Sequence, residues 1–263
     1  MTVLCRTAFF GGQISSRAGG ISARHILLAL ILVLPLMLAL GSLAGFAIGR
    51  VSAPPTSYRD QRFAEISADL RRVHGDYLLA AGDSHVVRWR SREFCGLPLV
   101  NAGIDGATAR DTDALLAELA LPHPPRAIIL TVGTNDANRK RFRDPPEAVI
   151  RFAQAFRPLL RKLAQKADLV VVTGVPPLDA RSPAGFSAEA AAGIRSSAEA
   201  SCRASASCRF ASSFRDEDSL TDGLHLADYD HAYRRIAPTV CAALEGARGP
   251  ASAPSQNADA DAP

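Results

Sequence analysis

Three short apolar runs, each ending at a glycine, constrain the fold of this chain most strongly. The runs and their glycines are residues 77–81 with Gly82, 97–102 with Gly103, and 127–132 with Gly133. A further apolar run follows at 169–173, and residues 209–214 are the last expected strand. Apolar runs that alternate with helical segments are typical of a parallel sheet covered on both faces. The active crevice of such a sheet lies beyond the carboxyl ends of its strands, so we expect the three glycines at its edge.

Helical spacing of apolar residues fills the stretches between these runs. The predicted helices cover residues 59–73, 111–121, 146–165, 187–200 and 228–244. Pro145 and Pro146 suit the first turn of the third helix. Pro238 should kink or break the last one. The sequence therefore predicts an α/β domain.

A long uncharged segment precedes this domain. Residues 26–48 contain no charged side chain, and 23 helical residues span about 34 Å, enough to cross a bilayer core of about 30 Å. We interpret the segment as a transmembrane anchor. The competing interpretation is a secretory signal cleaved near residues 45–47, since small residues stand there.

The arginines that flank the segment do not decide which side of the membrane the domain faces. The cysteines favour an extracytoplasmic domain, because four of the five follow the anchor, as suits an oxidising compartment. Cys202 and Cys208 are the pair expected to form a disulfide, with buried free thiols as the alternative. A domain that faces the cytoplasm is the alternative for the orientation.

The segments together define five regions. We divide the chain into an N-terminal segment (1–25), the anchor (26–48), a linker and leading helix (49–76), the α/β domain (77–245) and a disordered tail (246–263). The formal charge of +4 comes with no basic stripe interleaved with aromatic residues, so a nucleic-acid partner is not expected.

Four polar motifs lie where the predicted strands and the last helix meet loops. Ser84 follows the first strand in Gly82-Asp83-Ser84, where a strand end exposes its hydroxyl and a helix start offers free N–H groups. Taken alone this tripeptide also suits an ordinary helix cap. Gly103 ends the second strand, and Asn135 follows the third in Gly133-Thr134-Asn135-Asp136.

The fourth motif is Asp222-Gly223-Leu224-His225. A histidine can serve as a general base when a carboxylate holds its other ring nitrogen. A carboxylate three residues earlier, across a turn that contains glycine, can fold back to do so.

The order and spacing of these motifs resemble the four sequence blocks of the SGNH hydrolases, also called GDSL esterases and lipases, from about residue 77 to 245. The resemblance implies a three-layer α/β/α sandwich of the flavodoxin-like type. It implies Ser84 as the nucleophile, His225 as its base and Asp222 as the residue that orients His225. The N–H groups of Ser84 and Gly103 and the side chain of Asn135 would form the oxyanion hole, and no cofactor or metal is needed.

The expected activity is hydrolysis or transfer of acyl or acetyl esters by an anchored, periplasmic enzyme acting on envelope glycans. The alternatives are a lysophospholipase or thioesterase, and a binding module without catalysis. Ester substrates and the membrane are therefore the expected partners.

Three features have competing interpretations. His85 stands where many family members have Leu or Ile, and is either a second acid or base or, as we expect, a residue on the helix surface. The basic run at 139–143 either attracts anions or is a solvated loop. Residues 222–231 contain acidic residues and histidines that resemble a metal cluster, although no open-site zinc spacing is present.

Overall fold

The computed structural model describes residues 57–178 and 185–246, together with the isolated positions 31, 33, 35 and 37. The chain divides into two compact units, residues 1–54 and 55–263. Of the first unit, the four isolated positions are helical. Among the described residues no helix is both long and apolar enough to cross a membrane. Apart from those four positions, the predicted anchor at 26–48 lies outside the described residues, as do residues 1–25 and 247–263.

Six strands form one sheet in the second unit, in the order β2-β3-β1-β4-β5-β6. Their bounds are β1 Leu78–Gly82, β2 Glu93–Phe94, β3 Leu97–Gly103, β4 Ala127–Thr131, β5 Leu169–Val172 and β6 Cys208–Phe210. Only the short edge strand β2 is antiparallel to its neighbour. The parallel strands follow the flavodoxin-like order, in which the chain reverses direction across the sheet between β1 and β4. The predicted parallel α/β fold is confirmed.

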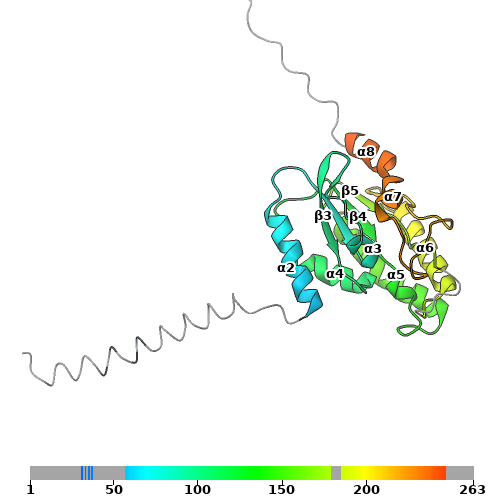
Figure 1. Ribbon diagram of the computed structural model, residues 1–263, viewed down its shortest axis with the longest axis horizontal. Coiled ribbons are helices and arrows are strands. Elements are labelled where there is room, and N and C mark those ends of the chain that lie inside the picture. The colour runs from blue at the N-terminus through cyan, green and yellow to red at the C-terminus, as the bar shows by residue number, and fades with distance from the viewer. Residues whose placement is uncertain are drawn as a thin grey trace, which may run out of the picture. The chain divides into compact units, whose positions relative to one another are not determined.

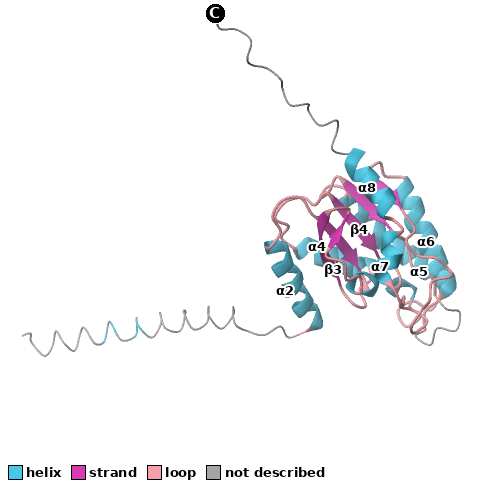
Figure 2. Ribbon diagram, turned by 45° about the horizontal axis from the view of Figure 1, so that its top comes forward, coloured by secondary structure: helices cyan, strands magenta, loops and turns pink. Residues whose placement is uncertain are grey.

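Helices cover both faces of this sheet (Figures 1 and 2). They are α2 Tyr58–Arg71, α3 Ser84–Val87, α4 Ala109–Glu118, η1 Asn135–Ala137, α5 Pro145–Leu163, α6 Ala188–Arg203, α7 Tyr229–Arg234 and α8 Ala237–Gly246. Successive strand residues point to opposite faces. Leu79 accordingly lies in a core shared with α2, α4, α5 and α6, whereas Leu78 lies in a second core with α3, α7 and α8. The result is three layers.

Local sequence explains most of the helix boundaries. Asp144 caps α5, and Pro145 and Pro146 open it, since a first-turn residue needs no N–H acceptor. The predicted helix at 228–244 is two helices, and Pro238 lies in the first turn of the second. The last strand is shorter than predicted and ends at Phe210. The elements β2 and η1 were not predicted, because two or three residues carry no periodic pattern.

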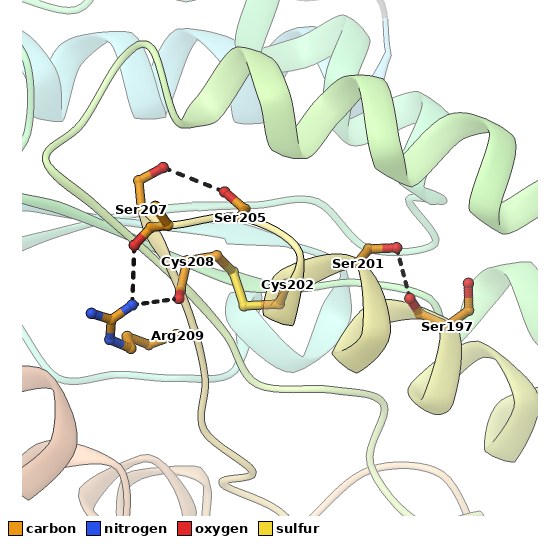
Figure 3. Close-up of a disulfide and its surroundings, with 8 residues drawn as sticks. Ser197, Ser201, Cys202, Ser205, Ser207, Cys208 and Arg209 are labelled. Atoms are coloured by element: carbon orange, nitrogen blue, oxygen red, sulfur yellow. Dashed lines mark hydrogen bonds between the residues drawn. A yellow bond between two sulfur atoms is a disulfide. The ribbon is translucent and has the colours of Figure 1, made fainter.

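Two disulfides tie the ends of these elements together. Cys202 and Cys208 join the end of α6 to the start of β6, as predicted (Figure 3). Cys95, between β2 and β3, is bonded to Cys241 of α8 across a sequence separation of 146 residues. Closing so long a loop restricts the unfolded chain strongly. The four cysteines that follow the predicted anchor are thus all paired.

Candidate active site

The sheet register brings the ends of three strands to one edge. Gly82 at the end of β1 lies opposite Gly103 on β3 and Thr131 on β4. The next backbone groups continue this contact, because the N–H of Asp83 donates to the carbonyl of Thr131 over 3.1 Å. The loops after β1, β3 and β4 therefore start side by side at the switch point of the sheet, the place where ligands bind in this type of fold.

The loop after β1 presents Ser84. Asp83 is the N-cap of α3 and accepts the N–H of His85 over 3.0 Å, so the capping role belongs to Asp83. Ser84 is the first residue of α3, and its hydroxyl is left for another partner. Only 7% of Ser84 is exposed. Asp83 is fully buried, and this burial raises the pKa of its carboxyl to about 7.

The loop before α7 brings a histidine and a carboxylate to Ser84. The hydroxyl oxygen of Ser84 lies 3.0 Å from Nε2 of His225, and Nδ1 of His225 lies 2.7 Å from Oδ2 of Asp222. The other oxygen of Asp222 accepts the backbone N–H groups of Leu224 and His225. Desolvation raises the pKa of Asp222, but the hydrogen bonds from His225 and Leu224 outweigh it and lower the pKa to about 2. Asp222 therefore stays ionised beside the imidazole.

This loop lies at the surface of the domain. The side chain of Asp222 is 55% exposed and that of His225 is 14% exposed. The backbone holds the two residues in place, because the N–H of Thr221 donates to the carbonyl of His225 over 2.8 Å and Leu220 pairs with Leu226 across the turn. The predicted turn thus folds Asp222 back onto His225.

The three expected oxyanion donors differ in the hydrogen bonds that they already make within the protein. The N–H of Ser84 is in the first turn of α3, where helix N–H groups lack an intrahelical acceptor. The amide of Asn135 donates one hydrogen to the carbonyl of Ala107 over 3.1 Å, which fixes the side chain and leaves its second hydrogen. The N–H of Gly103 donates to Oδ1 of Asn101 over 3.0 Å. Gly103 can therefore serve an oxyanion only by sharing or releasing that bond.

A model of the GDSL-like Lipase/Acylhydrolase family matches residues 75–229. The chain belongs to this family. The matched region contains the residues of all four motifs, from Ser84 to His225. No curated protein matches the chain.

Solved structures share the fold of this GDSL-like domain. A Streptococcus pneumonia protein named for a platelet activating factor is 18% identical, with a TM-score of 0.57 over 74% of this chain and 99% of its own. The lipase/acylhydrolase from Enterococcus faecalis is 17% identical, with a TM-score of 0.54 over 64% of this chain and 97% of its own. At these identities the likeness shows the fold.

His85 differs from the sequence-based expectation for this GDSL-like chain. We predicted a residue on the helix surface, whereas His85 is 0% exposed. Its Nδ1 lies 2.9 Å from the hydroxyl of Tyr229. The prediction was wrong because α3 is a single turn whose second residue faces α7, a neighbour that only tertiary packing supplies. Neither Tyr229 nor Asn101 was identified as a site residue, since both owe their places to contacts distant in sequence.

The polar cluster at residues 222–231 of this GDSL-like domain is accounted for by other contacts. Asp228 caps α7, and Asp230 accepts the N–H and hydroxyl of Ser91. Among the described residues no group of His, Cys, Asp and Glu is arranged to hold a metal ion.

The basic run at 139–143 is exposed, as a solvated loop would be. Arg141 donates to the carbonyl of Gly106 and pairs with Asp111.

Proposed function

We propose that this chain is a serine esterase in which Ser84 is the nucleophile, His225 the general base and Asp222 the residue that orients His225. One observation carries the proposal: a continuous series of contacts from the Ser84 hydroxyl through both nitrogens of His225 to Asp222, 3.0 and 2.7 Å long. A hydroxyl, an imidazole and a carboxylate in this order form the arrangement that activates a serine for attack on an ester.

The reaction follows from these contacts. Oγ of Ser84 attacks the ester carbonyl while Nε2 of His225 takes the hydroxyl proton, and Asp222 stabilises the imidazolium. The N–H of Ser84 and the side-chain amide of Asn135 donate to the negative oxygen of the tetrahedral intermediate. His225 then gives its proton to the departing alcohol, leaving an acyl group on Ser84. Water, or an acceptor hydroxyl, attacks this acyl-enzyme as His225 takes its proton. The acid or the new ester then departs while His225 gives that proton back to Oγ of Ser84.

The substrate we propose is an acyl or acetyl ester on a cell-envelope glycan. The half-exposed Asp222 places the reacting groups near the surface, where a bulky polymer can approach. A lysophospholipase or thioesterase would instead prefer long acyl chains.

Labelling with a fluorophosphonate probe tests the nucleophile. The wild-type chain should be labelled and Ser84→Ala should not. Ser91→Ala is the matched control, because the Ser91 hydroxyl is also hydrogen-bonded, but to the carboxylate of Asp230 over 2.8 Å and not to a histidine. This variant should be labelled like the wild type. Unlabelled wild type, or equal labelling of Ser84→Ala, would refute the serine esterase and favour a binding module. A panel of esters from acetyl to long acyl chains, with an acetylated glycan, then identifies the substrate class.

We also propose that residues 26–48 anchor the chain and that the domain lies outside the cytoplasm. Two disulfides among the described residues support this proposal, because such bonds persist in oxidising compartments. A topology reporter fused to the C-terminus should be active only outside the cytoplasm. Activity confined to the cytoplasm would reverse the orientation, and release of the chain into the soluble fraction would indicate cleavage of a signal.

A further inference from the structure

The hydroxyl of Tyr229 joins the two segments that carry the nucleophile and its base. On one side it lies 2.9 Å from Nδ1 of His85, the residue after Ser84. On the other side it accepts the backbone N–H of Leu226, the residue after His225, over 3.1 Å. His85 and Tyr229 are both buried. Each end of this connection is thus one residue from a reacting side chain.

We propose that His85 and Tyr229 are a positioning pair. Together they hold the loop that carries His225 against helix α3, so that His225 stays within hydrogen-bond distance of Ser84. The inference rests on the proposed function, since positioning matters only if Ser84 and His225 react. Neither residue of the pair touches the ester; both act through the backbone next to the groups that do.

The proton arrangement follows from the donors available. The N–H of Leu226 donates to the Tyr229 oxygen, and we assign the hydroxyl proton of Tyr229 to Nδ1 of His85. The imidazole then carries its own proton on Nε2, a buried atom without a hydrogen-bond partner among the described residues. This arrangement requires a neutral imidazole. Burial, followed by the charges of His225 and Arg88 and against the opposing effect of Asp222, lowers the pKa of His85 to about 3.

A neutral His85 also suits its distance from the base. The rings of His85 and His225 are 5.6 Å apart between centroids. A positive charge on His85 would oppose the imidazolium that forms on His225 during the reaction. His85 therefore supplies a hydrogen-bond acceptor without a competing charge.

Apart from the contacts with Ser84 and His85, the interactions named above that hold His225 come from its own loop. Asp222 holds the ring, and Thr221 holds the carbonyl. These contacts fix the conformation of the loop, whereas Tyr229 fixes the position of the loop relative to α3. Loss of the link should leave the Asp222–His225 contact intact but lengthen the contact from His225 to Ser84. A displacement of about 1 Å at reacting groups can cost about a hundredfold in rate.

The first test compares Tyr229→Phe with Tyr233→Phe in the detergent-solubilised full chain. Both variants lose a buried tyrosine hydroxyl from the same helix, but that of Tyr233 contacts Thr131 over 2.7 Å. Tyr229→Phe should lower kcat by about tenfold to a hundredfold with KM nearly unchanged, and should slow fluorophosphonate labelling equally. Tyr233→Phe should keep wild-type kcat, although both variants lower the unfolding temperature. Equal kcat for Tyr229→Phe and the wild type, or equal losses in both variants, would overturn the positioning role.

The second test uses two substitutions of His85. Asn places an amide oxygen near the position of Nδ1 and can still accept the Tyr229 proton, whereas Leu cannot. His85→Asn should therefore retain more kcat than His85→Leu, by about tenfold. If His85→Leu folds and matches the wild type in kcat, the pair has no positioning role. Failure of the proposed function is separable from this outcome, because then the wild type itself would show no activity that depends on Ser84.

Discussion

Asp222→Asn is expected to lower kcat by about 10⁴-fold while leaving the fold intact. The amide oxygen of Asn can still accept the N–H groups of Leu224 and His225, so the turn is preserved. The amide nitrogen that replaces Oδ2 cannot accept a proton from Nδ1 of His225, which lies 2.7 Å away. The imidazole would then favour the tautomer with its proton on Nε2, which cannot accept the proton of Ser84. Steady-state kinetics with an acetyl ester measure the loss.

Asp228→Asn is the matched control. Asp228 lies in the same segment and caps α7 by accepting the N–H of His231 over 2.8 Å. Asn is an equally good cap, so this variant should keep wild-type kcat. A loss of less than about tenfold in Asp222→Asn would show that His225 does not depend on this carboxylate, and the proposed triad would be reduced to Ser84 and His225.

Gly82→Ala is expected to destabilise the domain by about 4 kcal/mol or more, or to prevent folding. Gly82 has a φ of +146°, and a Cβ at this position would overlap the carbonyl oxygen of Thr131 on the neighbouring strand. That carbonyl accepts the N–H of Asp83, so neither strand can move without breaking the contact that starts the nucleophile loop. Chemical denaturation followed by circular dichroism measures the change.

Gly75→Ala separates backbone strain from the overlap. Gly75 also has a positive φ, +79°, but nothing lies within 4 Å of a Cβ built there. This variant should lose only about 1–2 kcal/mol, the usual cost of a left-handed conformation without glycine. Similar losses of stability in both variants would mean that close packing of β1 against β4 is not the reason that residue 82 must be glycine.

Local signals in the sequence predicted most elements of the fold. Apolar runs predicted the four parallel strands β1, β3, β4 and β5, because a strand buried on both faces needs apolar residues throughout. The proline signal at Pro145 and Pro146 predicted the start of α5. The boundaries of the last strand and the break before α8 were less accurate, since hydrogen-bond partners and not propensity decide where pairing ends.

Ser84 lies in a turn motif that is ambiguous by itself. The family was indicated by the order along the chain of Ser84, Gly103, Asn135, Asp222 and His225. That order is a property of the sequence, because each motif follows a strand or precedes a helix that its neighbours specify. The tertiary structure decided which of their groups are available. In the tertiary structure the N–H of Gly103 donates to the side chain of Asn101, and Asp83 caps α3. His85 is buried against Tyr229. Such contacts join residues from different elements, and no local pattern can specify them.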